Sequence, residues 1–346
     1  MRAVNTTIAA VSEGYAMTIR SNQNINQEFY DQKMPWEGPH TFYRAPMADN
    51  AKGADIAVIG MPQSFGHFLY CNQHWAPQAI REQSCCKGMF PSDWPWGCGL
   101  MNEYNVVDCG DVSYEPTIKS SFLENATNMV ERLARDGASI LSLGGDHMST
   151  EPLMKGLHRV YGGGWGLIDI DAHADLIAVD DDALDEHTCG NMFYLALKDG
   201  FLDPKKTFQL GLRTEEDLAQ DKWARDLGVS QIDVFECEDL GPVKIAEMIL
   251  EAVGDSKVIM TMDIDGFDPG ECGGGQASPH PGGLRFNWVR RMLQAMKGIN
   301  VVGADFVEID PVKDMESRTS TNVAVIILND MAHLMGLARK KRGTKC

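Results

Sequence analysis

The stretch Asp169-Ile170-Asp171-Ala172-His173-Ala174-Asp175 follows directly on the apolar run Trp165-Gly166-Leu167-Ile168. The apolar run is typical of a buried parallel strand, because helices cover both faces of such a strand. Acidic residues and a histidine then alternate, and alternation in an extended chain places their side chains on one side. Carboxylate oxygen and imidazole nitrogen together bind Mn, Fe, Ni or Zn. For this stretch alone, a solvated acidic turn after the strand is the alternative.

The rest of the chain repeats the strand pattern at wide spacing, with helical patterns between many of the strands. Because strands that alternate with helices form parallel sheets covered on both faces, we expect one large, doubly wound α/β domain. The expected strands are 55–60, 104–109, 138–143, 165–170, 207–212, 231–235, 258–263 and 300–306. The expected helices are 123–135, 240–253, 287–296 and about 319–339, with a further helix starting at Ala76.

The first part of the chain has a different character. Residues 1–53 show no clear period, contain several prolines and are rich in Asn and Gln. We interpret them as an N-terminal arm that lies on the surface or on a neighbouring subunit, and we expect residues 54–346 to form the catalytic domain.

Charge and cysteine content restrict the possible partners and compartment. The chain has 49 acidic and 31 basic residues, a formal net charge of -18, which argues against binding to nucleic acid or an anionic membrane. No stretch approaches the roughly 20 apolar residues of a membrane span, and the N-terminus lacks the pattern of a signal peptide. Nine cysteines, an odd number without a CxxC pair, favour a reduced cytoplasmic compartment.

Two further strand ends carry residues that bind metals. One reads Gly144-Gly145-Asp146-His147, and the other reads Asp263-Ile264-Asp265-Gly266-Phe267-Asp268-Pro269. Taken singly, the histidine could be a core residue and the acids a turn. Taken together, two imidazoles and four carboxylates suffice for two metal ions that share a bridging water, which becomes hydroxide at neutral pH. We call this set the ligand cluster: His147, Asp171, His173, Asp175, Asp263 and Asp265.

These three motifs, in this order and at this separation, resemble the signatures of the ureohydrolase family, which includes arginase and agmatinase. The resemblance runs from about Asp55 to Lys340. It implies a three-layer α/β/α domain with an eight-stranded, mostly parallel sheet, assembled as a trimer or hexamer. It also implies hydrolysis of a guanidino carbon–nitrogen bond at two divalent ions, commonly manganese and in some members nickel.

The resemblance also implies roles for individual residues. Val307-Glu308-Ile309-Asp310-Pro311 is similar to the family's Val-Glu-Val-x-Pro stretch, so Glu308 inherits the binding of the guanidinium group. Asp175 would orient the attacking hydroxide while it binds metal, and a general acid must protonate the leaving nitrogen. By position, one ion is held by His147, Asp171, Asp175 and Asp263, and the other by Asp171, His173, Asp263 and Asp265.

The loop after the second signature departs from the family. Relatives usually carry a histidine before Gly-Thr-x-Phe, and this position is occupied here by Cys189, with His187 two residues earlier. Both remain candidates for the proton shuttle, although Cys189 could be an inert packed thiol. Asn191 in the same loop is a candidate contact to the substrate.

Two more departures bear on the substrate. The loop 63–75 is aromatic and carries two histidines, and His280 stands where relatives have Glu or an apolar residue. If the backbone follows the family, His280 faces the pocket and is a candidate contact to the substrate; the alternative is a solvated loop histidine. An apolar, desolvated entrance to the active site disfavours a substrate that carries a second charged group without a partner. We therefore expect a small cationic substrate: guanidine, an alkylated guanidine or a biguanide rather than agmatine. The alternative is a weakly active metal-binding subunit that supports a homologous subunit in a hetero-oligomer. A third, less favoured possibility is a single-zinc deacetylase of the same fold.

Overall fold

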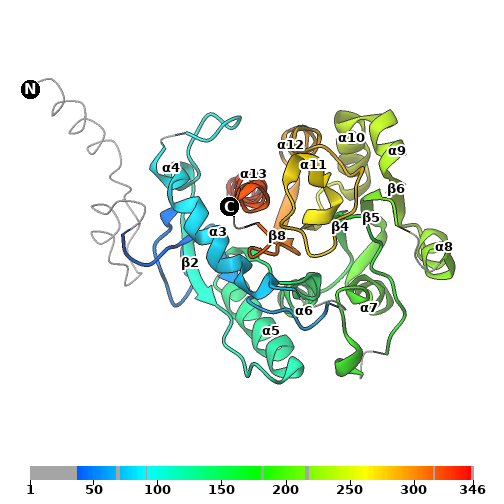
Figure 1. The fold of residues 1–346 in the computed structure, drawn as a ribbon, viewed down its shortest axis with the longest axis horizontal. Helices are drawn as coiled ribbons and strands as arrows, with labels where there is room; N and C mark the ends of the chain where they lie inside the picture. The colour runs from blue at the N-terminus through cyan, green and yellow to red at the C-terminus, as the bar shows by residue number, and fades with distance from the viewer. Residues whose placement is uncertain are drawn as a thin grey trace, which may run out of the picture.

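The structure, a computed structural model, describes residues 37–67, 71–90, 92–180, 183–214, 218–314 and 316–343. These residues contain an eight-stranded parallel sheet with the strand order β2-β1-β3-β8-β7-β4-β5-β6 (Figure 1). The strands are β1 (Ile56–Gly60), β2 (Val106–Asp111), β3 (Ser139–Leu143), β4 (Trp165–Ile170), β5 (Leu202–Leu212), β6 (Ser230–Asp233), β7 (Lys257–Asp263) and β8 (Asn300–Val307). All eight predicted strands are present.

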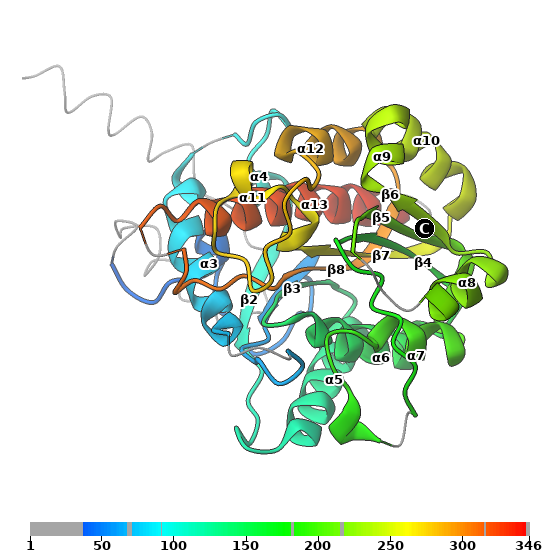
Figure 2. The same ribbon diagram turned by 45° about the vertical axis from the view of Figure 1, so that its right-hand side comes forward.

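Helices cover both faces of the sheet, which confirms the three-layer α/β/α fold. One layer holds α5, α6 and α7, and the other holds α3, α12, α13 and α10 (Figure 2). The helices are α3 (Ala76–Cys85), α4 (Leu100–Glu103), α5 (Lys119–Arg135), α6 (Thr150–Tyr161), α7 (Met192–Lys198), α8 (Leu218–Leu227), α9 (Val234–Leu240), α10 (Pro242–Val253), α11 (Pro269–Cys272), α12 (Phe286–Ala295) and α13 (Thr319–Gly343).

The central strands are apolar on both faces because each face packs against a helix layer. In β3, Leu141 and Leu143 belong to the core cluster that includes α13, whereas Ile140 belongs to the cluster on the α5 side. Full burial of one such side chain contributes about 1.5–3 kcal/mol. This burial holds the central strands in register, and their carboxyl ends bear the sequence motifs.

The predicted helix over 240–253 is instead two helices, because glycine and proline divide it. Gly241 has a φ of 77° and terminates α9, and Pro242 opens α10. The expected strand 231–235 also ends earlier, at Asp233, since its side chain accepts a hydrogen bond from the Glu236 amide and caps α9.

Part of the predicted N-terminal arm packs into the domain. Residues 1–36 lie outside the described residues, but Phe42, Tyr43 and Ala45 are buried. The Phe42 amide donates to Asp108 on β2 at 2.9 Å, and the Tyr43 amide donates to Ser84 on α3 at 3.0 Å. The expectation of a surface arm is therefore wrong for these residues, because their aromatic side chains fill the space beside the edge strand.

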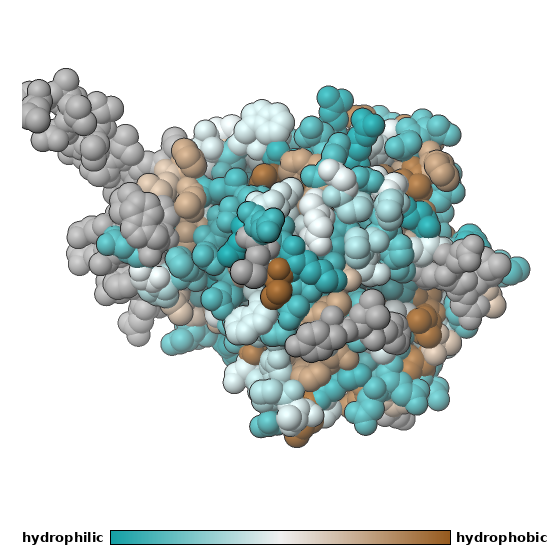
Figure 3. Space-filling view, in the orientation of Figure 1, coloured by the Kyte–Doolittle hydropathy of each residue, from teal (hydrophilic) through white to brown (hydrophobic). Residues whose placement is uncertain are grey.

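Helix α13 is long and apolar enough to span a membrane by length and composition, but 83% of the relevant window is buried inside the protein. It is a core helix that packs on β8 and α3. The face in Figure 3 is mostly hydrophilic with scattered hydrophobic residues. The eight cysteines within the described part of the chain are free thiols.

Candidate metal centre

Neighbouring strands bring the three motifs and Glu308 to one edge of the sheet. The strand order β3-β8-β7-β4 means that the residues after these strands meet, although they are far apart in sequence. His147 follows β3, Asp263 ends β7, and the second signature follows β4. Because carboxyl ends of parallel strands face the same way, the whole ligand cluster converges.

One half of the ligand cluster surrounds His147 Nδ1. This atom lies 3.0 Å from Asp171 Oδ2, 3.0 Å from Asp175 Oδ2 and 3.4 Å from Asp263 Oδ2. Two neighbouring donors on an octahedral ion, each about 2.1 Å from it, are about 3 Å apart. The spacing of the four atoms therefore suits a single divalent ion.

The other half surrounds His173 Nδ1, which lies 3.3 Å from both Asp171 Oδ1 and Asp265 Oδ2. Asp171 thus presents one oxygen to each histidine, as a bridging carboxylate must. Asp263 and Asp265 complete a group with Asp171 in which the donor atoms lie within 4.8 Å of one another. The Asp263 carboxylate also accepts a hydrogen bond from the Asp265 amide, which fixes the turn between them.

Two of the donor atoms lack the hydrogen bonds that buried polar atoms normally make. His147 Nδ1 and Asp171 Oδ2 are fully buried, and neither makes a well-directed hydrogen bond with a described group. Such atoms are costly unless something else binds them. The four carboxylates carry four negative charges, and two divalent cations would balance them. The residues therefore fit a dinuclear metal site.

The titration behaviour of the ligand cluster reflects the same excess of buried negative charge. Burial, followed by the charge of Asp171, raises the pKa of Asp175 to about 7. Burial and the neighbouring carboxylates also raise the pKa of Asp263 well above its ordinary value. Burial alone would lower the pKa of His147, but the surrounding carboxylates raise it. The raised pKa values of the carboxylates thus reflect the cost of burying several negative charges together, a cost that bound cations would offset.

Residues behind His147 orient its ring. Nε2 lies 2.9 Å from Thr261 Oγ1, and Thr150 donates to Asp305 at 2.8 Å in the same buried region. If Nε2 donates its proton to Thr261, the Nδ1 lone pair points into the ligand cluster. Partners of this kind fix the tautomer of metal-binding histidines. Sequence reasoning did not identify Thr261, since an ordinary strand threonine gives no signal.

The first motif also shapes the adjoining loop. A side chain at Gly145 would place its Cβ 2.1 Å from the Gln63 carbonyl oxygen, so only glycine fits. The buried Asp146 carboxylate accepts hydrogen bonds from the Gln63 side chain at 2.6 Å and the Gly66 amide at 2.6 Å. Burial raises the pKa of Asp146 to about 7. This contact fastens the 63–67 loop segment beside His147.

Glu308 lies next to the ligand cluster on a residue with a left-handed φ of 64°. Its Oε1 accepts from the His147 amide at 2.8 Å, and its Oε2 accepts from Gln73 Nε2 at 2.8 Å. His67 Nε2 lies 3.6 Å from the same oxygen. Burial raises the pKa of Glu308 to about 7. Sequence reasoning did not assign Gln73 or His67 to the site; the unusual pair of histidines in their loop was the available signal.

The loop with the proposed proton shuttle places its residues differently. His187 is fully buried, and its Nδ1 lies 3.0 Å from both Glu151 oxygens on α6. Cys189 is half-buried, and burial together with the charges of Glu308 and Asp175 raises the pKa of its thiol well above the ordinary value. Asn191 uses its side chain within the loop, bonding the Thr188 amide and the Glu186 carbonyl.

His280 lies beside the ligand cluster. Its ring is 4.8 Å from that of His173, at an angle of 74°. Arg213 donates a hydrogen bond from Nη2 to the His280 carbonyl oxygen at 2.6 Å and also contacts the Asp265 carbonyl oxygen. The sequence analysis did not identify Arg213. Burial, and then the neighbouring His173, lowers the pKa of His280.

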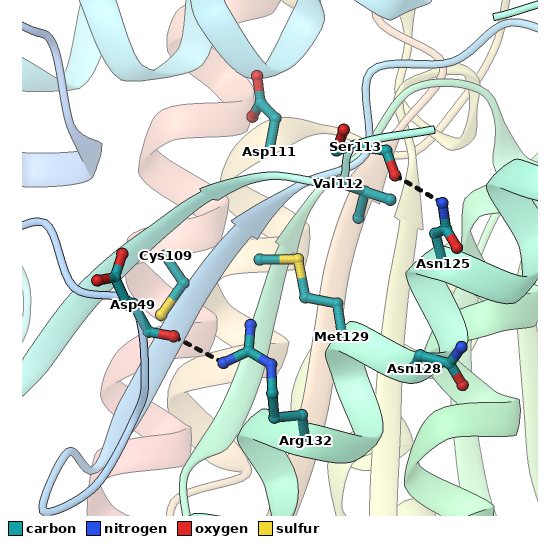
Figure 4. Close-up of a pocket in the computed structure, with 9 residues that line it drawn as sticks. All are labelled: Asp49, Cys109, Asp111, Val112, Ser113, Asn125, Asn128, Met129 and Arg132. Carbon is teal, nitrogen blue, oxygen red and sulfur yellow. Dashed lines mark hydrogen bonds between the residues drawn. The ribbon is translucent and has the colours of Figure 1, made fainter. Parts of the chain in front are cut away.

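A separate pocket of about 440 Å³ lies between β2 and α5 (Figure 4). In it, Arg132 donates to the Asp49 carbonyl and Asn125 donates to the Ser113 carbonyl. No residue of the ligand cluster lines this pocket. Its lining residues are Asp49, Cys109, Asp111, Val112, Ser113, Asn125, Asn128, Met129 and Arg132.

Comparison with known proteins agrees with this geometry. The model of the arginase family matches residues 54–333. An agmatinase from Chromobacterium violaceum is 33% identical over 305 residues, covering 87% of this chain and 89% of the relative. An agmatinase from Escherichia coli O7:K1 is 32% identical over 289 residues, covering 83% and 90%.

Solved structures give the same result. A hypothetical agmatinase from Burkholderia thailandensis superposes with a TM-score of 0.81 at 29% identity, covering 89% of this chain and 93% of that chain. Proclavaminate amidino hydrolase from Streptomyces clavuligerus superposes with a TM-score of 0.80 at 26% identity, covering 88% and 100%. Fold and site define a hydrolase that acts on the carbon–nitrogen bonds of linear amidines. The chain belongs to the arginase family, the ureohydrolases.

Proposed function

We propose that this protein hydrolyses a small or alkylated guanidine, or a biguanide, at a dinuclear site formed by the ligand cluster. The observation that carries the proposal is the convergence of six metal-binding side chains next to one buried glutamate, Glu308. The negative charges of the four carboxylates balance the positive charges of two divalent ions, and the charge of Glu308 balances that of one guanidinium. Manganese and nickel fit this set of ligands best.

The chemistry divides between the metal ions and the chain. When bound, two divalent ions supply Lewis-acid activation of a water molecule. Asp175 points its carboxylate into the ligand cluster, 3.0 Å from His147, where it can hold the attacking water by a hydrogen bond. Glu308 binds the guanidinium and sets its plane against this water, because both Glu308 oxygens are fixed by neighbouring donors.

Proton delivery to the leaving nitrogen is assigned to Cys189. Its backbone amide donates to the Gly66 carbonyl at 3.1 Å, which holds it against the 63–67 loop segment beside His147. Burial raises the pKa of its thiol, which favours the protonated form. His187 instead directs Nδ1 to Glu151. We therefore assign His187 to holding the loop and Cys189 to proton transfer. Asn191, the other substrate contact expected in this loop, uses its side chain to hold the loop in the same way.

The surroundings of Glu308 support a small substrate. His67 and Gln73 adjoin its outer oxygen, and Cys71 lies 3.7 Å from His67. These three side chains offer no anion to a second cationic group. The carboxylate of Asp310, which contacts the same loop, is fully buried and already bound by Asn72. Arg213 adds a positive charge beside Asp265. A substrate with a distal ammonium would lose hydration there without gaining a partner.

The test is a substrate panel with the purified chain, loaded with Mn²⁺ or Ni²⁺ and assayed for urea or amine release. The panel comprises guanidine, a dimethylbiguanide, guanidinobutyrate, agmatine and arginine. We expect the highest kcat/KM for guanidine or the biguanide. A strong preference for agmatine would overturn the small-substrate proposal. Absence of turnover by a chain that holds two ions would indicate instead a supporting subunit of a hetero-oligomer, and the mass of the assembly would show whether it is a trimer or hexamer.

A further inference from the structure

We propose that His280 is a third imidazole ligand of the metal centre: one of its ring nitrogens coordinates the ion held by His173 and Asp265. This inference rests on the dinuclear site of the proposed function. Its main observation is that His173, Asp265 and His280 each offer a donor atom, and these atoms lie within 4.8 Å of one another. His280 is not part of the ligand cluster derived from the sequence motifs.

The position of the His280 ring suits a metal ligand better than a packed aromatic residue. The ring lies 4.8 Å from the ring of His173 and nearly perpendicular to it, at 74°, so the two imidazoles are neighbours, and both have a donor atom close to one of Asp265. The contact between His280 Nε2 and Ser278 Oγ is long, at 3.4 Å. A hydrogen bond of this length is weak, and a metal ion can replace it.

Arg213 holds the His280 segment in place. Its guanidinium donates to the backbone carbonyls of His280 at 2.6 Å and Pro281 at 3.2 Å, and it also contacts the Asp265 carbonyl. One side chain thus joins the His280 backbone to the turn that carries a metal ligand. Arg213 is therefore a positioning residue, and it limits the entropy lost when His280 binds an ion.

A third imidazole changes the preferred metal. Carboxylate oxygens suit Mn²⁺, whereas added imidazole nitrogens favour metals later in the first row, such as Co²⁺ and Ni²⁺. The ion beside His147 would have one imidazole, and the ion beside His173 would have two. We therefore expect His280 to make the second position selective for Ni²⁺ or Co²⁺ over Mn²⁺.

X-ray absorption of the Ni²⁺-loaded protein tests this directly, because the outer-shell scattering counts imidazole ligands without any substrate. Three imidazoles over two ions give about 1.5 per ion in the wild type, and two give about 1.0 in His280→Ala. The matched control is His158→Ala, a histidine on α6 whose ring stacks on Phe201 at 4.2 Å. It should retain the wild-type value.

Competition between Ni²⁺ and Mn²⁺ gives a second readout. In His280→Ala, the Ni²⁺ affinity of one position should fall by roughly 10- to 100-fold, and the Mn²⁺ affinity should fall less. Arg213→Gln should also lower the imidazole count, since it releases His280 without removing it; a count unchanged from the wild type would exclude the positioning role.

The outcomes separate this inference from the proposed function. A wild-type protein that binds two ions with about 1.0 imidazole per ion would overturn the role of His280 and leave the dinuclear site intact. A wild-type protein that fails to bind two ions would overturn the proposed function itself. If His280→Ala does not fold, His280→Gln provides the same test, because it retains bulk and polarity.

Discussion

At the scale of single residues, Glu308 combines a strained backbone with a fixed side chain. Its left-handed φ of 64° is uncommon for a non-glycine residue and points its carboxylate toward the ligand cluster. Donors on the first motif and on Gln73 hold both oxygens. The carboxylate is thereby oriented before substrate arrives, so its charge acts without reorganisation.

Glu308→Gln should lower kcat/KM by roughly 10- to 100-fold, because a hydrogen bond to a charged group is worth about 1.5–3 kcal/mol. Steady-state kinetics with the best substrate of the panel measures the effect, and metal analysis should still find two ions per chain. Glu103→Gln, at an exposed residue paired with Lys340, serves as control. Unchanged kcat/KM in Glu308→Gln would exclude guanidinium binding at this residue.

The two shuttle candidates can be separated by comparing activity with stability. Cys189→Ala should lower kcat by roughly 100-fold with little change in Tm, since a positioned proton donor contributes at least this much. His187→Asn should instead lower the free energy of unfolding by about 1–3 kcal/mol, because it leaves buried Glu151 without this partner. The reverse pattern would move proton transfer to His187.

The residues of the ligand cluster could be predicted because each combines a metal-binding side chain with a place at a strand end. His67, Gln73, Thr261 and Arg213 could not. They reach the site through contacts between segments remote in sequence, such as Gln73 with Glu308. The residue types of Thr261 and Arg213 are common on any strand or loop, so no local pattern distinguishes them. For His67 and Gln73, the unusual pair of histidines in their loop was the one available signal, and it did not assign a role to either residue.

At the scale of elements, turns after the strands require close backbone approaches. Gly145 lies against the backbone of the 61–63 segment, and Gly266 lies against the backbone of β4. The same glycines that end the strands thus bring a neighbouring segment to the site. Element boundaries were predicted less well, because capping by Asp233 and the break at Gly241 depend on local hydrogen bonds.

Gly145→Ala should destabilise the protein by about 1–3 kcal/mol, because its Cβ would lie 2.1 Å from the Gln63 carbonyl oxygen and force a backbone shift. Urea unfolding measures the loss, and kcat/KM should fall with it as the loop moves. Gly274→Ala, where a Cβ meets open space, is the matched control. Equal stability of the two variants would contradict this close packing.

Thr261→Val tests the support behind His147. Valine keeps the shape and the strand preference but removes the partner of Nε2, so metal affinity should fall by roughly 10- to 100-fold. Calorimetric titration of metal into the metal-free variant measures this change. Thr127→Val removes a hydroxyl bond to Leu123 on α5, remote from the site, and should leave metal affinity unaltered.

At the scale of the whole molecule, the parallel sheet was predictable because alternating strands and helices allow few arrangements. The order of the strands in the sheet could not be predicted, since it depends on which crossover connections pack best. The sequence indicates where each strand lies along the chain but not which strands pair. The ligand cluster still followed from the sequence, because all carboxyl ends of parallel strands share one edge whatever their order.

Removal of metal should lower global stability, since four buried carboxylates then repel one another. At a metal concentration 1,000-fold above Kd, each bound ion stabilises the folded state by about 4.1 kcal/mol. Thermal unfolding before and after chelation, and after metal is restored, should show a fall in Tm of several degrees that is reversed. A Tm independent of metal would indicate that the ligand cluster holds no ion.

The place of β8 in the sheet has a consequence for biosynthesis. β8 is the last strand in the chain, yet it lies between β3 and β7 in the middle of the sheet. A nascent chain on the ribosome can therefore form only two partial sheets, each with an exposed strand edge that invites aggregation. The ligand cluster combines residues that follow β3 with residues that follow β4 and β7, so the complete metal site can form only after β8 has been synthesised and has joined these halves.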